Sequence, residues 1–166
     1  MKCGVTVKKV EPEDLDSLAD LMRQEAEKGD WSFSADNPRH HDNVAHMTVQ
    51  LSMNPEDEDM GWIAYKDGEP AGFITMPDKN LPGGVFVSET ARNSGVAKSL
   101  VLAREEYLRD ELGWTEVERP IEAGNYPSIS LHVNSLGYEF TQASRETLRD
   151  PDLTEDTVIY VRKDLV

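Results

Sequence analysis

The sequence predicts an α/β (α+β) protein in which a mixed sheet is covered by helices on both faces. Short apolar stretches typical of strands alternate with stretches whose apolar residues recur at helical spacing, in the order β-α-α-β-β-β-α-β-α-β-β. The chain has 166 residues, of which 38% are hydrophobic and 30% are charged, so it is long enough to bury one core. We therefore expect a single domain over residues 1–166, without an internal repeat or a linker.

The first expected elements are a strand over residues 5–10 and a helix that opens at residues 11–14. This opening contains Pro12 among acidic residues, and both types are favourable in the first turn of a helix. Apolar residues recur there at i, i+3, i+4 and i+7, which predicts one buried stripe made of Leu15, Leu18, Ala19 and Met22. An irregular stretch over residues 31–41 and a shorter helix over residues 43–53 should follow.

A hairpin and a long helix are expected in the middle of the chain. Strands over residues 61–65 and 71–76 flank Asp67-Gly68, a pair preferred in tight hairpins. After a third strand, a helix should begin beyond Gly95 and end at Gly113. Its Glu105 and Arg109 lie four residues apart, a spacing that supports a helix. Its expected apolar face consists of Ala97, Leu100, Val101, Leu108 and Leu112.

The last third should form a strand, a helix and two further strands. The strand covers residues 115–122, where Pro120 requires a sheet edge, a bulge or a break. Asn125 should cap the helix, which Gly137 ends. The apolar face of that helix consists of Ile129, His132, Val133 and Leu136. The final strands lie around residues 138–143 and 157–161, on either side of an acidic loop.

Composition limits the partners and the compartment. A formal net charge of −15 argues against nucleic acid, because phosphate backbones require clustered Lys and Arg. No apolar run approaches the roughly 18 residues of a membrane helix, and the N-terminus lacks the apolar region of a secretion signal. The one cysteine, Cys3, fits a reducing compartment. These observations predict a cytoplasmic protein. Its acidity has three competing explanations, namely solubility, adaptation to salt, and attraction of cationic substrates.

The stretch from Val85 to Leu100 predicts an anion site. It contains a short apolar strand, a polar turn and the start of a helix, whose first N–H groups have no partners within the helix. Gly95 and Ala97 are small enough to let an anion approach the backbone. The window from residue 92 to residue 104 contains no acid and three cations. An ordinary helix start is the alternative interpretation.

The segment Arg92-Asn93-Ser94-Gly95-Val96-Ala97, preceded by the strand Val85–Val87, resembles the pyrophosphate signature Gln/Arg-x-x-Gly-x-Gly/Ala of the GNAT acetyltransferases. Asn125 at a helix start and Gly137-Tyr138 after that helix match two further features of this family. The resemblance covers nearly the whole chain. It implies the GNAT acyl-CoA N-acyltransferase fold, with a mixed, mostly antiparallel central sheet of six to seven strands. The interval from Asn125 to Gly137 is one residue longer than the commonest spacing in the family.

The resemblance implies transfer of an acetyl group from acetyl-CoA directly to a primary amine of a small molecule or peptide. By analogy with the family, the backbone near Val87 should polarise the thioester carbonyl, and the diphosphate of coenzyme A should lie on the turn before the helix. The expected cofactor-binding residues are Phe86, Val87, Arg92, Asn93, Ser94, Gly95, Val96, Ala97, Lys98, Asn125 and Ser128.

Three residues are candidates for moving protons. Glu122 is our preferred proton acceptor for the amine, ahead of Glu118 and Glu89, although each of these acids could be a solvated surface residue. His132 occupies the helix position where the family often has a tyrosine that protonates the departing thiolate. A histidine on an apolar stripe is also commonly a core residue. Tyr138 and Tyr126 are alternative proton donors, with packing as the competing role for Tyr138.

No metal site is expected, since the spacing of His40, His41 and His46 misses the i, i+4 pattern. Residues 31–53, the hairpin near Gly68 and the loop over residues 145–156 should shape the acceptor pocket. Acidic loops favour a cationic acceptor, and the family resemblance is compatible with a homodimer. Two rival functions stay open at this point. One is a CoA-binding sensor without catalysis. The other is a nucleotide-binding phosphotransferase, whose Gly-x-x-x-x-Gly-Lys-Ser/Thr motif is absent.

Overall fold

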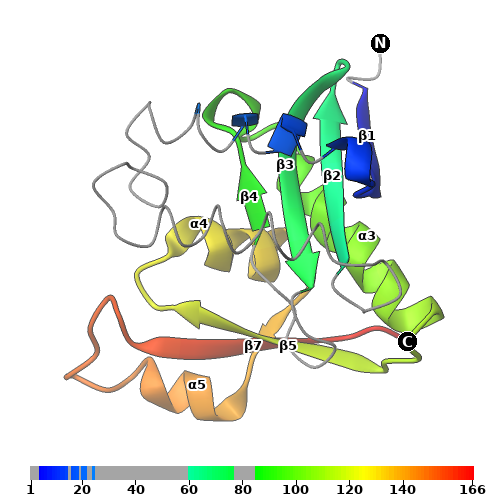
Figure 1. Ribbon diagram of the computed structural model, residues 1–166. Helices are drawn as coiled ribbons and strands as arrows, with labels where there is room; N and C mark the ends of the chain where they lie inside the picture. Colours follow the sequence, from blue (N-terminus) through cyan, green and yellow to red (C-terminus); the bar gives the residue numbers. More distant parts are fainter. Residues whose placement is uncertain (1–3, 15, 19, 22–23, 25–59, 77–84) are drawn as a thin grey trace. The chain divides into compact units, whose positions relative to one another are not determined.

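A computed structural model describes residues 4–14, 16–18, 20–21, 24, 60–76 and 85–166 (Figure 1). The expected helix over residues 43–53, the acidic loop that follows it and the histidines of residues 40–46 lie outside these ranges. The chain divides into two compact units, Met1–Arg104 and Glu105–Val166. We describe each unit by itself.

The first unit contains a four-stranded antiparallel sheet in the order β1-β2-β3-β4. Its strands are β1 (Val5–Lys9), β2 (Met60–Lys66), β3 (Glu69–Met76) and β4 (Val85–Val87). The turn between β2 and β3 has positive φ at both Asp67 (52°) and Gly68 (83°), as a two-residue hairpin of right-handed twist requires. The expected hairpin is therefore confirmed.

One face of this sheet holds an apolar core. The buried cluster consists of Leu18, Leu21, Ile63, Phe73 and Phe86, with Val10 and Tyr65 packed against it. Leu18 and Leu21 lie in helical backbone, so the part of the predicted amphipathic helix that the structure describes has the expected inward residue at Leu18. The rings of Phe73 and Phe86 stack with centroids 5.2 Å apart, which joins β3 to β4 on this face.

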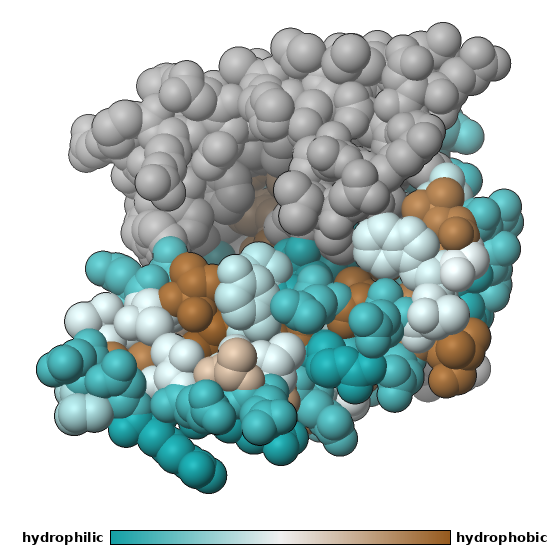
Figure 2. Space-filling view, turned by 90° about the horizontal axis from the view of Figure 1, so that it is seen from below, coloured by the Kyte–Doolittle hydropathy of each residue, from teal (hydrophilic) through white to brown (hydrophobic). Residues whose placement is uncertain are grey.

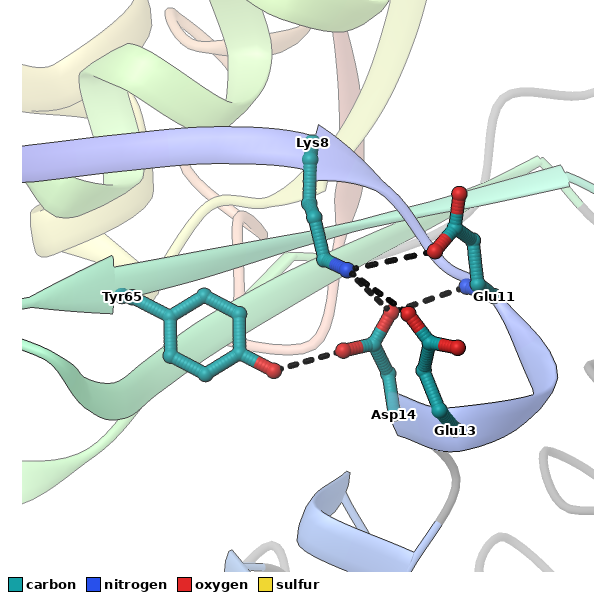
Figure 3. A network of polar contacts seen from close by, with 5 residues as sticks. All are labelled: Lys8, Glu11, Glu13, Asp14 and Tyr65. Carbon is teal, nitrogen blue, oxygen red and sulfur yellow. Dashed lines mark hydrogen bonds and ion pairs between the residues drawn. The ribbon is translucent and has the colours of Figure 1, made fainter.

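Asp14 organises the connection after β1. Residues Pro12–Asp14 form a 3-10 turn, η1, and the Asp14 carboxylate lies at its end with its side chain 5% exposed. Figure 3 shows the side chains of Lys8 and Tyr65 directed at this carboxylate. Asp14 Oδ1 accepts the Tyr65 hydroxyl at 2.6 Å, and Oδ2 accepts the Glu11 N–H at 2.9 Å. Lys8 Nζ lies 3.1 Å from Oδ2.

These contacts set the protonation of the Asp14–Tyr65 pair. Burial pushes the pKa of Asp14 upward, but the bonds from Tyr65, Glu11 and Lys8 outweigh it and hold the pKa below its ordinary value. Burial and the hydrogen bond to Asp14 raise the pKa of Tyr65 to about 12. The network is thus an ionised carboxylate held by a neutral phenol and a lysine.

Helix α3 (Val96–Asp110) follows a short turn, η3 (Glu89–Ala91), and continues from the first unit into the second. The expected inward residues Leu100, Val101 and Leu108 are fully buried. Leu112 is 36% exposed, and its expected place on the buried face is wrong. The helix ends at Asp110, before Leu112. After this end, the Trp114 N–H bonds back to the Leu108 carbonyl at 2.9 Å.

Two charged residues of α3 are buried, which its apolar pattern does not predict. Arg104 is 1% exposed and Glu105 is 5% exposed. Arg109 makes two bonds to Asp110, of 2.7 and 3.0 Å. Glu105 accepts hydrogen bonds from two residues outside the helix, Tyr138 and Lys163. Glu105 and Arg109 are four residues apart in the helix, but each of them bonds to other residues.

The second unit contains a three-stranded antiparallel sheet in the order β5-β7-β6. The strands are β5 (Glu116–Glu122), β6 (Glu139–Phe140) and β7 (Val158–Asp164). Pro120 lies opposite Tyr160, whose N–H donates to Ser144 Oγ and whose carbonyl accepts from Thr141 N–H. Tyr160 therefore directs its peptide groups away from β5. The nitrogen of Pro120 faces the outer edge of the sheet, so the edge is the one of the three expected alternatives that the structure shows.

The expected strand over residues 138–143 is wrong beyond its second and third residues. After β6, residues Gln142–Thr147 form helix α5. Thr141 caps this helix, because its Oγ1 accepts the Ser144 N–H at 3.2 Å. A Thr followed by helix-forming residues was a usable signal for this start. The other expected strand, over residues 157–161, exists as β7 and extends further, to Asp164.

Seen from below the view of Figure 1, the surface formed by the described residues is mainly hydrophilic. Hydrophobic residues appear there separately among hydrophilic ones (Figure 2), as expected for a chain with a net charge of −15. Among the described residues, no helix has the length and apolar character needed to cross a membrane.

Candidate functional site

Strand β4 exposes peptide groups at the edge of the first sheet. The Ser88 N–H donates to the Ala71 carbonyl at 2.9 Å, and the strand register pairs Phe86 with Phe73. Backbone groups alternate between the two sides of an antiparallel strand. The N–H and C=O of Val87, between these pairs, therefore point away from β3. Arg92 Nε lies 3.4 Å from the Val87 carbonyl oxygen, which agrees with this direction.

A turn with unusual backbone geometry joins this edge to α3. Asn93 has φ of 62° and Gly95 has φ of 84°, and successive residues of alternating handedness form anion-binding concavities. Gly95 precedes the helix, and its carbonyl accepts the Ser99 N–H at 3.0 Å. A glycine has no side chain to cap the helix start, so the first N–H groups, on Val96, Ala97 and Lys98, are left for another acceptor.

The side chains of this turn differ in their exposure. Arg92, Asn93 and Lys98 are exposed, and Ser94 is half-buried with its hydroxyl donating to the Ala91 carbonyl. Arg104, the third cation of the acid-free window, is buried. The surface near the turn thus carries two cations of the three that the sequence count predicts.

Burial limits what two of the predicted cofactor-binding residues can offer. The side chain of Phe86 is buried against Phe73, and its peptide groups pair with β3. Phe86 therefore presents neither its ring nor its backbone at the outer edge. Val96 is 1% exposed, so it can contribute its N–H group alone.

In the second unit, Glu122 lies at the end of β5 on its exposed face. The alternation of this strand buries Val117 and Ile121 and exposes Glu118 and Glu122. The Glu122 carbonyl accepts the Asn125 N–H at 2.9 Å, which starts the turn into the next helix. Both carboxylates are therefore accessible, with Glu122 next to that turn.

The loop before β7 binds this turn. The Ala123 N–H donates to the Thr157 carbonyl at 2.8 Å, and the Gly124 N–H donates to the Glu155 carbonyl at 2.9 Å. The predicted acceptor loop over residues 145–156 thus contacts the residues directly after Glu122. This contact supports a role of the loop at the same end of β5.

Helix α4 (Tyr126–Ile129) begins as the sequence predicts. Asn125 is its N-cap, and its Oδ1 accepts the Ser128 N–H at 3.3 Å. The helix continues as a π-helix, η4 (Ser130–Ser135). A π-turn accommodates an extra residue within a helix and often lies at a functional site. The π-helix explains how the longer interval between Asn125 and Gly137 is accommodated.

His132 is buried within η4, at 3% exposure. Its Nδ1 lies 2.7 Å from the Ser128 carbonyl oxygen and 3.5 Å from Ser128 Oγ. Since a carbonyl oxygen only accepts hydrogen bonds, Nδ1 carries a hydrogen. Nε2 is therefore the nitrogen that gains or loses a proton.

Tyr138 is 2% exposed and its hydroxyl donates to Glu105 Oε1 at 2.7 Å. Its ring meets the His132 ring edge-on, with centroids 4.9 Å apart. This arrangement gives Tyr138 a packing and hydrogen-bonding role and argues against its use as a proton donor. The sequence does not point to Glu105 or to Lys163, whose Nζ lies 2.7 Å from Glu105 Oε2. From the sequence alone, two charged residues at these positions are expected at the surface, and only the tertiary contacts show that they pair.

Within the part of the chain that the structure describes, no group of three or more His, Cys, Asp or Glu could hold a metal ion. The candidate groups of the first unit are backbone N–H groups and two surface cations, and those of the second unit are exposed carboxylates and a buried imidazole.

The profile of the acetyltransferase (GNAT) family matches residues 22–138. The chain belongs to the GNAT acetyltransferase family. It is an acetyl-CoA-dependent N-acetyltransferase by this membership, and the match includes both the turn before α3 and Tyr138. A search of curated proteins finds no match to this chain.

Solved acetyltransferases share the fold at low sequence identity. The PaiA N-acetyltransferase of Thermoplasma acidophilum, in complex with coenzyme A, has 16% identity and a TM-score of 0.68 over 97% of this chain and 99% of that one. The ribosomal-protein-alanine N-acetyltransferase of Brucella melitensis has 18% identity and a TM-score of 0.64, over 96% and 99%. YncA of Salmonella typhimurium, with its cofactor acetyl-CoA, has 14% identity and a TM-score of 0.65, over 98% and 94%.

The residues of this GNAT protein fit coenzyme A. Coenzyme A combines a chain of amides with phosphates, and the first unit offers a matching donor set. The outward N–H and C=O of Val87 suit an amide chain, and the N–H groups at the start of α3 suit a diphosphate. Arg92 and Lys98 add positive charge beside these N–H groups.

Proposed function

We propose that this GNAT protein transfers the acetyl group directly to a primary amine of a small molecule or peptide, with the whole chain acting as one acetyltransferase domain. The observation that carries the proposal is the edge of β4. The outward peptide groups of Val87 lie five residues before Arg92, and η3 and the turn containing Asn93 and Gly95 connect this strand to α3. A cofactor that lies along this edge can place its phosphates at the helix start.

The acyl donor supplies an acetyl thioester. In the proposal, the N–H of Val87 donates to the oxygen that gains negative charge during the transfer, which is an oxyanion-type role. The N–H groups of Val96, Ala97 and Lys98 hold the diphosphate together with Arg92. Asn93, Ser94 and Gly95 shape the turn that brings these N–H groups to the phosphates.

Glu122 is proposed to accept a proton from the acceptor. A primary alkylamine is mostly protonated near pH 7, because its pKa is about 10, and only the neutral amine is nucleophilic. An exposed carboxylate at the end of β5 can take this proton directly or through water. Asn125, three residues later, is proposed to serve as helix cap and cofactor contact, with Ser128 beside it.

His132 is proposed to protonate the departing thiolate. The hydrogen on Nδ1 is bound to Ser128, so Nε2 is the atom that would carry and deliver the proton. Tyr138 is not proposed for this role, because its hydroxyl hydrogen is held by Glu105 Oε1. In this proposal His132 exchanges protons, and Tyr138 packs against the imidazole of His132.

A cationic acceptor is the finer part of the proposal. Between α5 and β7, the segment that binds the turn after Glu122 carries four exposed acids, namely Asp150, Asp152, Glu155 and Asp156. Together with the net charge of −15, they would attract polyamines, aminoglycosides or lysine side chains. A cytoplasmic location stays a prediction from the sequence, and a homodimer stays a prediction from the family resemblance.

The test is thiol release from acetyl-CoA against a panel of cationic, neutral and anionic amines, with coenzyme A binding measured in parallel by calorimetry. Amine-dependent release that is fastest with cationic amines supports the proposal. Release dominated by neutral or anionic amines contradicts the cationic acceptor. Binding of coenzyme A without release for any amine contradicts the transfer itself and favours a sensor.

A further inference from the structure

Glu105 is a buried carboxylate that the proposed reaction does not use. Its side chain is 6% exposed, and it accepts hydrogen bonds at both oxygens. Tyr138 donates to Oε1 at 2.7 Å, and Lys163 lies 2.7 Å from Oε2. Lys163 Nζ also lies 5.7 Å from the centre of the Tyr138 ring. A buried charge is costly unless its partners satisfy it, so this carboxylate depends on both of them.

The three side chains come from distant parts of the second unit. Glu105 lies on α3, and Lys163 lies on β7 on the same face as the buried Ile159 and Val161. Tyr138 follows the end of η4. The carboxylate therefore ties the residue after η4 to a helix and to a strand, and limits where the Tyr138 ring can lie.

Tyr138 in turn holds His132 in two ways. The Tyr138 N–H donates to the His132 carbonyl at 2.9 Å. The two rings meet at an interplanar angle of 81°. On its other side the imidazole is bound through Nδ1 to the Ser128 carbonyl. The ring is thus fixed between a carbonyl and an aromatic side chain.

We propose that Glu105 is a positioning residue, which through the Tyr138 hydroxyl keeps the imidazole of His132 in the orientation that bonds Nδ1–H to Ser128 and assigns proton exchange to Nε2. The importance of Glu105 for catalysis rests on the proposed function of His132. The effect of Glu105 on the orientation of the imidazole is independent of that function. Arg119 of β5 is half-buried, and this burial lowers the pKa of its guanidinium.

Nitrogen NMR of the histidine rings tests this proposal in the full chain, with His132 assigned by comparison with a His132→Gln variant. Tyr138→Phe removes the hydroxyl and keeps the ring. We expect the His132 signals to move from the Nδ1–H form toward a mixture of both neutral forms. Tyr65→Phe is the matched control, because it removes an equally short hydroxyl bond to a buried carboxylate, Asp14, at a distance of 2.6 Å. The control should leave the His132 signals unchanged.

Two variants of Glu105 separate positioning from packing. Glu105→Leu removes both acceptor oxygens and should move the His132 signals as Tyr138→Phe does. Glu105→Gln keeps one oxygen to accept the tyrosine hydroxyl and should restore most of the Nδ1–H form. In the active enzyme we expect Tyr138→Phe to lower kcat about tenfold with the KM for acetyl-CoA within about twofold.

Unchanged His132 signals in a folded Tyr138→Phe or Glu105→Leu protein would overturn the proposal. Should Tyr138→Phe fail to fold, Glu105→Leu carries the same decision. Displaced His132 signals in a protein that transfers no acetyl group would support positioning by Glu105 and refute the proposed function. The two ideas therefore fail separately.

Discussion

Tyr138 donates its hydroxyl hydrogen to Glu105 at 2.7 Å, across 33 residues of sequence. The first unit repeats this arrangement with other residues, since Tyr65 donates to Asp14 at 2.6 Å and Lys8 lies beside the same carboxylate. In each unit a tyrosine and a lysine satisfy a buried acid. Both acids would otherwise destabilise the fold, because an unpaired buried charge is costly.

Removal of the guanidinium of Arg92 should weaken cofactor binding. Arg92→Ala is expected to raise the Kd for coenzyme A about tenfold, or about 1.4 kcal/mol, because a charged donor beside the phosphates is lost. Calorimetry at two salt concentrations measures this, and the effect should shrink at high salt. Arg109→Ala is the control at the other end of α3, where the guanidinium is bound to Asp110. Equal losses in both variants would contradict a phosphate contact at Arg92.

Gly95 should be needed for its backbone angle. Gly95→Ala is expected to cost about 1 kcal/mol of folding stability, since a side chain at positive φ is strained. Gly68→Ala is the matched control, with a φ of 83° against 84° at Gly95 and with open space around an added Cβ at both positions. Thermal unfolding should show similar losses. Only Gly95→Ala should also weaken coenzyme A binding, and equal binding in the two variants would speak against the turn as the phosphate site.

Glu122 should be distinguished from its neighbour on the same strand. Glu122→Gln is expected to lower kcat by roughly a hundredfold or more, the range of a lost general base, with little change in the KM for acetyl-CoA. Glu118→Gln, on the same exposed face of β5, should stay within about twofold of the unaltered protein. Steady-state kinetics with the best amine decides between them. A loss that is larger in Glu118→Gln would move the proton acceptor to that residue.

The Asp14–Tyr65 bond should make stability fall at high pH. The pKa of Tyr65 is raised to about 12, whereas a tyrosine in the unfolded chain has a pKa of about 10. The neutral phenol therefore stabilises the folded state below pH 10, and this contribution is lost as the pH rises toward 12. Tyr65→Phe should lower the free energy of unfolding at pH 7 by about 1–2 kcal/mol and flatten the alkaline decline.

At acidic pH, folding stability should change with pH in the opposite direction and rise as the pH rises. Because the pKa of Asp14 is lowered, its contribution is present above the ordinary pKa of an aspartate and is lost as the pH falls. Urea unfolding from pH 3 to pH 12 measures both limbs. Tyr160→Phe, at an exposed tyrosine, is the control. An alkaline decline that is as steep in Tyr65→Phe as in the unaltered protein would contradict the hydrogen bond.

Local chemistry explains which parts of the fold the sequence predicts. The Asp67-Gly68 hairpin, the N-cap at Asn125 and the edge position of Pro120 depend on backbone geometry that single residue types favour. The turn before α3 belongs to the same class, because small residues and a helix start define it. These features need little information from the rest of the chain.

Other features depend on tertiary contacts. The sequence places Arg104 and Glu105 among the polar positions of α3, and the partners that satisfy the buried Glu105, Tyr138 and Lys163, lie far away in sequence. The π-helix is visible in the sequence only as a spacing one residue too long. The sequence predicts a cofactor contact at Phe86, which lies in β4. Only the register with β3 shows that the peptide groups of Phe86 face β3 and not the outer edge.

The central claim is direct transfer of an acetyl group to an amine. The most direct measurement counts the coenzyme A thiol released and the N-acetylated amine formed in the same reaction. We predict one acetylated amine per thiol, no release without amine, and loss of both products in Glu122→Gln. Bound coenzyme A with neither product, or thiol release that does not depend on the amine, would contradict the account.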